Sequence, residues 1–250
     1  MSTNKLKFNE DKTEIMMVGT PARVKTIDMK YIDLCGDSIP TSKCVKNLGV
    51  TLDSTLTMDK HISQLRKACY FELRRIAQIR SYLSIESANR LVCSLITSKL
   101  DYCNSLFAGI TDTQINKIQQ VQNNAARLVT KTHKREHITP VLKHLHWLPI
   151  RHRIEYKIAT TAYQCLYEQS YPQYLKNLII PYTPSRSLRS STKNMLKHQR
   201  TQLKNYGQRA LPSMAAEVWN NLPTPVKESP NLNVFKSNVK THLFRKAYIV

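Results

Sequence analysis

Acidic residues are scarce in this 250-residue chain: 17 aspartates and glutamates accompany 38 lysines and arginines, for a formal net charge of +21 at pH 7. The imbalance is greatest between residues 131 and 210, which hold 15 basic and 3 acidic residues. A field of this sign and size favours a polyanionic partner. The charge therefore points to RNA or DNA as the partner to consider first.

Long apolar runs and a secretion signal are also missing. No hydrophobic run approaches the roughly 20 residues that cross a bilayer, and the opening MSTNKLKFNED has no apolar core after its lysine. We therefore expect a cytoplasmic or nuclear protein that is neither secreted nor membrane-inserted. The six cysteines are dispersed singly, so we expect reduced thiols rather than a disulfide framework.

Motifs for metal or phosphate chemistry are absent as well. Five glycines form no phosphate-binding loop, and no cysteine pair has zinc-ligand spacing. The eight aspartates all lie in the first 112 residues but none adjoins another, whereas two-metal polymerases need clustered carboxylates. The spacings of His133 with His137 and of His144 with His146 suit a metal, but no cysteine or carboxylate pair accompanies them. We therefore expect no metal, no cofactor and no catalytic residue supplied by this chain alone.

Short β-like runs occupy the first 58 residues. They are TEIMMVG (13–19), VKTIDMKYIDL (24–34) and KNLGVTL (46–52), separated by turn signals rich in glycine, proline and aspartate. We predict a small antiparallel β segment that is too short to be stable alone.

The period changes at Asp59. Apolar residues then recur every three or four positions as far as Leu83, which predicts one face of an amphipathic helix. A second helix is expected over residues 85–107 behind an N-cap at Ser84. The fold class is therefore mostly α with a small N-terminal antiparallel β segment (α+β), with residues 59–182 as a helical bundle and 183–250 as a basic C-terminal region.

Capping residues predict three further helix starts. Thr111 and Gln114 fit a capping box, Thr139 and Pro140 fit the N-cap and first helical position, and Pro149 fits the start of a fifth helix. A last amphipathic stretch follows from residue 233 to 248.

Cations recur in the C-terminal region at steps of 3, 4, 4, 3 and 4, so they would line one face wherever that segment is helical. Few acids interrupt them, which favours phosphate binding over a merely solvated surface. Arg151 and Arg153, just after Trp147, join the candidate contacts. The members of the basic stripe are Arg186, Arg189, Lys193, Lys197, Arg200 and Lys204.

Trp147 lies between histidines and arginines in HLHWLPIRHR. It could stack on a base or anchor the junction of the fourth and fifth helices, and we favour the anchor. We expect Trp219 to be a core residue.

In order along the chain, seven strings resemble the C-terminal part of reverse transcriptases from LINE-type (non-LTR) retrotransposons, most closely the jockey-like group. Together they cover essentially the whole chain. They are MSTNKLKFNEDKTEIMMVG, VKNLGVTLDSTLTMDKHI, SKLDYCNSLFAGI, IQQVQNNAARLV, ITPVLKHLHWLPIRHRIEYKI, LRSS and VWNNLP with FKSNVKTHLF.

The resemblance implies roles for a few residues. Lys12 matches the lysine of the motif that follows the catalytic Ala-Asp-Asp box, where an ammonium could assist the leaving group. Leu48, Gly49 and Val50 match the element after the palm that positions the primer, and the helices from Asp59 match the thumb. Residues 1–58 would then be the end of the palm and a primer-grip-like element.

The catalytic aspartates that bind Mg²⁺ in this family belong upstream of the matched strings. The resemblance therefore implies a truncated polymerase piece without activity of its own, which keeps sequence-tolerant binding of a template–primer backbone. Two alternatives stay open: a basic helical nucleic-acid-binding module with its own role, and a helical scaffold for an acidic protein. Activity would require the missing polymerase portion from another chain.

Overall fold

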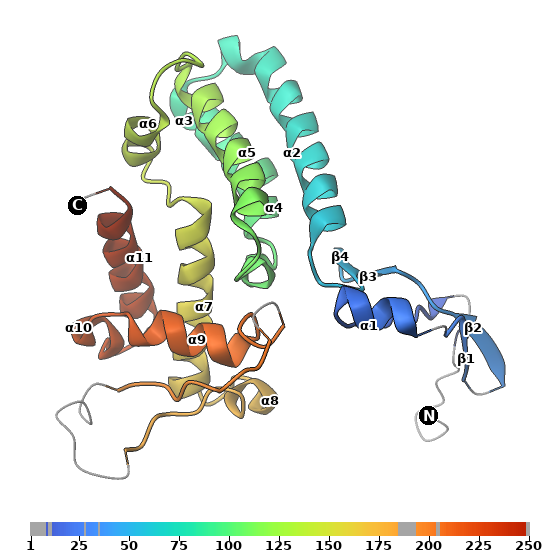
Figure 1. Ribbon diagram of the computed structural model, residues 1–250. Helices are drawn as coiled ribbons and strands as arrows, with labels where there is room; N and C mark the ends of the chain where they lie inside the picture. The colour runs from blue at the N-terminus through green and yellow to red at the C-terminus, as the bar shows by residue number, and fades with distance from the viewer. Residues whose placement is uncertain are drawn as a thin grey trace. The chain divides into compact units, whose positions relative to one another are not determined.

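The computed structural model describes residues 9, 12–27, 29–34, 36–184, 194–203 and 206–248. It is mostly α-helical with two small antiparallel sheets near the N-terminus, which confirms the expected fold class (Figure 1). The chain divides into two compact units, Met1–Leu65 and Arg66–Val250. The three-part division expected from the sequence stays a prediction.

The first unit contains two antiparallel hairpins. In one, β1 (Tyr31–Leu34) pairs with β2 (Asp37–Pro40), and in the other β3 (Cys44–Asn47) pairs with β4 (Val50–Asp53). Leu48 and Gly49 alone connect β3 to β4, with φ angles of 45° and 84°. Two successive positive φ values are those of a type I′ turn, whose twist matches the flanking strands.

One expected strand is absent from the described part of the first unit, and another is shortened to β1. Residues 13–19 form a single parallel bridge, from Ile15 to Thr41, and α1 (Pro21–Thr26) replaces the start of the run at 24–34. The reason is local, because the Thr20 hydroxyl accepts the N–H of Arg23 and proline suits the first helical position.

Asp53 shapes the entry into α2 (Asp59–Ile79). Its carboxylate accepts the backbone N–H groups of Thr55, Thr57 and Met58 at 3.2, 2.9 and 2.7 Å, and both threonine hydroxyls as well. Burial tends to raise the pKa of this carboxyl, but the hydrogen bonds from Thr57, Thr55 and Met58 outweigh burial and lower it. The next residues along the chain then begin the helix.

In the second unit, α2 ends in the short η3 (Arg80–Tyr82), and α3 (Ile85–Val92) follows. Ser84 caps α3 as expected, because its hydroxyl accepts the N–H of Ser87 at 3.1 Å. Cys69, Leu73 and Ile76 are buried, in agreement with the period read from the sequence.

The helix expected over residues 85–107 is interrupted by a π-helical segment, Cys93–Thr97, before α4 (Ser98–Asp101). From α3 to α4 the buried residues are Ala88, Val92, Ile96 and Leu100, each four positions after the one before. In an α-helix with 3.6 residues per turn, a residue four positions on points about 40° away from the first. A π-helical segment has more residues per turn, so it brings these side chains back toward the same side. Cys103, with φ of 50°, then ends the helical path before η5 (Asn104–Phe107).

Three helices follow with starts close to those predicted. Thr111 is the N-cap residue of α5 (Asp112–Thr130), although its side chain makes no capping bond. The helix α6 (Ile138–His144) begins after His137 rather than at Thr139, and α7 (Ile150–Tyr167) begins after Pro149. These small offsets lie within the usual uncertainty of helix ends.

The C-terminal helices are α8 (Gln173–Lys176), α9 (Leu211–Asn220), α10 (Thr224–Lys227) and α11 (Leu232–Tyr248). Among them, α8, α9 and α11 pack on α7, and α10 packs on α11 (Figure 1). The Phe235 ring stacks on Tyr163 at 4.3 Å and on Trp219 at 5.8 Å between centroids. Trp219 is fully buried, as expected, and its indole N–H donates to the Asn194 carbonyl.

None of the helices within the described ranges is both long enough and apolar enough to span a bilayer.

Candidate nucleic-acid interface

The basic stripe expected on a helix is not helical where the structure describes it. Residues 194–203 contain no helix, and the exposed side chains of Lys197 and Arg200 project from irregular backbone. The helical arrangement is therefore wrong for this part, while phosphate binding by its cations stays a prediction. The remaining members, Arg186, Arg189, Lys193 and Lys204, lie outside the described residues.

Partners distant in sequence account for the extended backbone. The Asn220 side chain accepts the N–H of Leu196 at 2.8 Å and donates to its carbonyl at 3.0 Å. The N–H of Lys197 donates to the carbonyl of Ile180, beside an antiparallel bridge between Pro181 and Leu196. These bonds occupy backbone groups that a helix would need for itself.

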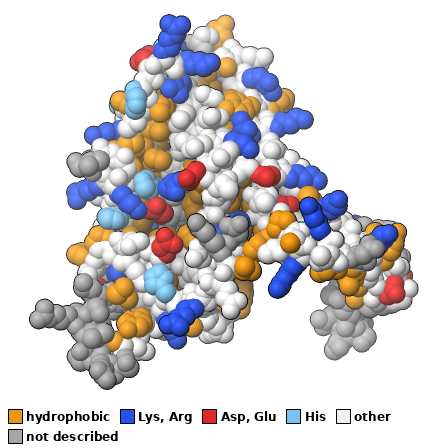
Figure 2. All heavy atoms as spheres, viewed as in Figure 1, with side chains coloured by type: hydrophobic (Ala, Val, Ile, Leu, Met, Phe, Trp, Pro, Cys, Tyr) orange, Lys and Arg blue, Asp and Glu red, His pale blue; other side chains and the backbone are white. Residues whose placement is uncertain are grey.

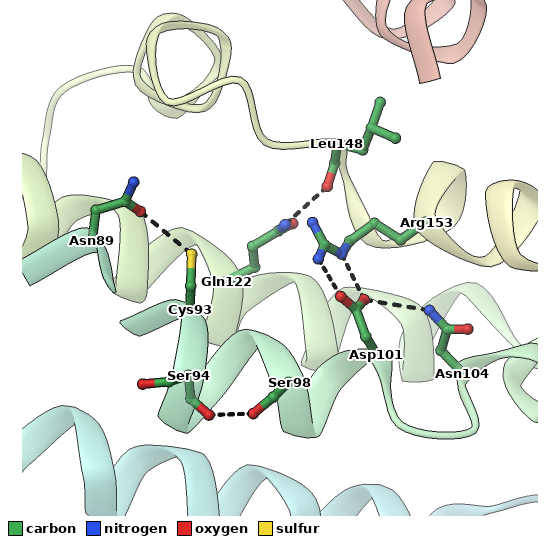
Figure 3. A network of polar contacts seen from close by, with 9 residues as sticks. All are labelled: Asn89, Cys93, Ser94, Ser98, Asp101, Asn104, Gln122, Leu148 and Arg153. Carbon is green, nitrogen blue, oxygen red and sulfur yellow. Dashed lines mark hydrogen bonds and ion pairs between the residues drawn. The ribbon is translucent and has the colours of Figure 1, made fainter. Parts of the chain in front are cut away.

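Arg151 and Arg153 are both paired with aspartates. Arg151 is 60% exposed and bonds Asp112 through Nη2 at 2.5 Å. The side chain of Arg153 is only 19% exposed. It donates to both carboxylate oxygens of Asp101, from Nε to Oδ1 at 2.7 Å and from Nη2 to Oδ2 (Figure 3). Arg151 can still exchange its partner for a phosphate at the surface, whereas Arg153 would first have to break a half-buried pair.

The residues assigned by resemblance lie in the first unit. Lys12 is exposed, and its backbone N–H bonds Asn9. Leu48 and Gly49 form the tip of the β3–β4 hairpin, and Val50, which directly follows the turn and pairs with Asn47, is buried. Leu48 is therefore displayed on a tight turn, as a residue that contacts a ligand would be, but its role stays a prediction.

The structure brings together a basic face on α2 that the sequence reading did not single out. Lys67, Phe71, Arg74 and Gln78 follow one another at steps of 4, 3 and 4, and all are exposed, as is Arg75 beside them. We call these five residues the α2 surface. Positions seven apart lie on the same side of a helix, so Lys67 and Arg74 are aligned at roughly 10 Å.

The charges of the α2 surface are not neutralised equally. Glu72 lies 3.3 Å from Arg75 and 3.2 Å from Lys99, and it therefore offsets those two cations. Across the described ranges, Lys67 and Arg74 form no ion pair. The guanidinium of Arg75 also lies 5.7 Å from the centroid of the Phe71 ring, a cation–π distance. Two unpaired cations thus flank an exposed aromatic ring.

A shallow groove of about 320 Å³ borders the α2 surface between α2 and α5. It is lined by Tyr70, Leu73, Arg74, Ala77, Asn124 and Leu128. Asn124 donates to the Tyr70 hydroxyl at 3.0 Å, which ties the two helices together beside the groove. The basic face is therefore carried by packed helices rather than by a loop.

The signal for the α2 surface was present in the sequence. The same three- and four-residue steps that mark the buried side of residues 59–79 leave Lys67, Phe71 and Arg74 on the opposite side. The apolar positions alone predict the helix, and the basic positions between them mark its exposed side.

A second cavity, of about 360 Å³, lies among η5, α7, α9 and α11. At its rim, Glu155 bonds Lys246 at 3.0 Å and lies 3.5 Å from His152. Burial works to raise the pKa of Glu155, but hydrogen bonds and charge from His152 and Lys246 lower it below its usual range. This carboxylate is thus held ionised by its neighbours.

Over the described part of the chain, no three His, Cys, Asp or Glu side chains are grouped to hold a metal ion. Trp147 is buried, and its carbonyl accepts the Tyr248 hydroxyl at 2.5 Å. Trp147 therefore anchors the junction before α7, as favoured from the sequence.

Part of the chain is similar to a protein of known class. A segment of 95 residues, 37% of the chain, is 28% identical to a probable RNA-directed DNA polymerase from the transposon X-element of Drosophila melanogaster. The matched segment corresponds to 10% of that relative's length. No protein-family model matches the chain, and no solved structure matches it significantly. The similarity supports a relationship to retrotransposon reverse transcriptases.

Proposed function

We propose that this chain is part of a LINE-type retrotransposon reverse transcriptase of the jockey-like group, comprising the end of the palm, the thumb and the C-terminal region. Its function is to hold a template–primer duplex through the phosphate backbone. The 28% identity to a transposon polymerase supports the family, and the α2 surface is the observation that carries the binding role.

The chemistry of the α2 surface suits phosphates rather than bases. Lys67 and Arg74 present unpaired cations on one side of a rigid helix, and such contacts carry no sequence information. Backbone binding of this kind lets a polymerase move along any template. Phe71, between them, can pack on a sugar or a base edge.

The first unit contributes to the same task in this proposal. Leu48, at the tip of the hairpin, contacts the primer strand, and Lys12 lies near the pyrophosphate leaving group once the catalytic carboxylates and Mg²⁺ are supplied by the rest of the polymerase. The proposal therefore assigns polymerisation to the whole polymerase and not to this chain alone.

Binding is tested with a fluorescently labelled RNA–DNA hybrid over a range of salt concentrations. Each neutralised phosphate contributes about −0.9 to the slope of log affinity against log salt. We expect Lys67→Glu with Arg74→Glu to weaken binding at least tenfold and to reduce the slope by about 1.8, as for two lost phosphate contacts.

The matched control is Lys240→Glu with Arg245→Glu, which removes two exposed cations from α11. This control has the same net charge as the α2 double variant, so a difference between them isolates position from total charge. Equal weakening in both, or a wild-type slope near zero, would refute the α2 surface. Primer extension by the purified chain with Mg²⁺ or Mn²⁺ would refute the absence of activity.

A further inference from the structure

Three apolar side chains protrude where α2 turns into α3. Tyr82 is 88% exposed, and Ile79 and Ile85 are 46% and 52% exposed. We call these three residues the apolar tip. Apolar side chains gathered at one exposed place, rather than scattered singly, commonly mark an interaction site.

The apolar tip stands on a rigid base made by Arg80. This side chain is only 5% exposed, and it donates from Nη1 to the Leu83 carbonyl at 2.7 Å. It also donates from Nε to Leu128 at 2.8 Å and from Nη2 to Val129 at 2.5 Å. The turn is thereby fastened to the last carbonyls of α5, so Tyr82 is displayed from an ordered support.

Because Arg80 bonds the carbonyls of Leu128 and Val129, the loop that follows α5 lies close to the apolar tip. Directly after α5, residues Lys131, Lys134 and Arg135 are all exposed, and we call them the basic loop. The nearby Glu136 turns its carboxylate back onto the N–H of His133 at 2.8 Å, and Glu86 is exposed in the first turn of α3. Figure 2 shows basic and hydrophobic side chains together at the upper end of the molecule.

We propose that the apolar tip and the basic loop bind an unpaired stretch of nucleic acid, with Tyr82 stacked on a base and the basic loop on the adjoining phosphates. This inference rests on the proposed nucleic-acid binding and adds a second site of different chemistry. The α2 surface contacts the backbone of a duplex, whereas the apolar tip contacts bases that a duplex would hide.

The chemistry favours single-stranded nucleic acid over other occupants. An aromatic ring that protrudes between two β-branched side chains offers a flat face for any base, and stacking of this kind tolerates every sequence. The surrounding cations match phosphates in sign, and they supply the salt-dependent part of such binding. An anionic lipid surface would also meet the cations and could take up the ring, so a vesicle-binding measurement separates it from a nucleic acid.

The test compares a 12-nucleotide oligo-dT or oligo-U with a duplex of equal length, bound to the full chain. We expect Tyr82→Ala to weaken single-strand binding about tenfold and duplex binding less than twofold. Tyr82→Trp should retain single-strand affinity, and its fluorescence should be quenched on binding. Tyr174→Ala, which removes another exposed tyrosine from α8, is the control and should change neither affinity.

The outcomes separate this inference from the proposed function. Duplex binding by the wild type with unchanged single-strand binding by Tyr82→Ala would overturn the tip site and leave the α2 surface standing. Equal weakening of single-strand binding and duplex binding by Tyr82→Ala would also overturn the tip site. Binding to phosphatidylserine vesicles that Tyr82→Ala abolishes, with single-strand binding intact, would assign the tip to a lipid surface instead. Absence of any nucleic-acid binding by the wild type would refute both proposals.

Discussion

The guanidinium of Arg153 faces the carboxylate of Asp101 side-on, with Nε on one oxygen and Nη2 on the other (Figure 3). The pair joins the first turns of α7 to the end of α4. Asn104 donates to the same carboxylate from 3.4 Å. A bidentate pair of this kind is geometrically specific and here half-buried, so it fixes how the two helices pack.

Arg153→Ala should therefore lower the free energy of unfolding, whereas Arg151→Ala should not. Loss of a charge-assisted bidentate bond from a half-buried site costs about 2 kcal/mol. The exposed pair of Arg151 with Asp112 is worth about 0–1 kcal/mol. Urea unfolding of the two variants checks this, and similar stabilities for both would show that the Asp101 pair contributes little.

Asp53→Asn should destabilise the first unit at neutral pH and make its stability less dependent on acid. The folded pKa of Asp53 is lowered from its usual value, so its contribution is present above about pH 4 and is lost as pH falls through the folded pKa. The difference between wild type and variant should thus shrink below about pH 4. Urea titrations from pH 3 to 7 measure it, and a constant difference would contradict the assignment.

Arg80→Met should cost about 3 kcal/mol or more, since it leaves the carbonyls of Leu83, Leu128 and Val129 without their donor in a buried place. Arg80→Lys should recover only part of this loss, because one ammonium cannot reach three carbonyls in the same geometry. Thermal unfolding of both variants provides the comparison. A stable Arg80→Met variant would show that the turn is held by other contacts.

Cys93 should react with a thiol reagent in the native state long before Cys69. Burial raises the pKa of Cys69 to about 11, while Cys93 is exposed beside Asn89. With a disulfide reagent at pH 8, Cys93→Ser should remove one rapidly reacting thiol. Cys69→Ser should leave the rapid phase unchanged, and loss of that phase in this variant would contradict the burial.

Features that depend on neighbouring residues were predictable from the sequence. The hydroxyl of Ser84 caps α3 because the bond spans three residues, and the buried side of α2 follows from a simple period. The burial of Trp219 was likewise expected, since a large ring between apolar residues rarely stays in solvent.

Features that depend on distant partners were not predictable. Nothing near Leu196 indicates that Asn220, 24 residues away, will bond its backbone and keep the segment extended. Arg80 looks like any surface cation until the carbonyls of α5 are placed beside it. Residues 24–26 were expected to begin a β-like run, but the Thr20 cap and Pro21 make them helical.

The π-helical segment Cys93–Thr97 has a consequence for the history of the sequence. A π turn holds one residue more than the α turn it replaces, while the helix on either side stays in phase. Deletion of a single residue here would restore a continuous α ladder without displacing Ala88 or Leu100 from the interior. Homologous chains should therefore differ in length by one residue at this point more readily than elsewhere in the helix.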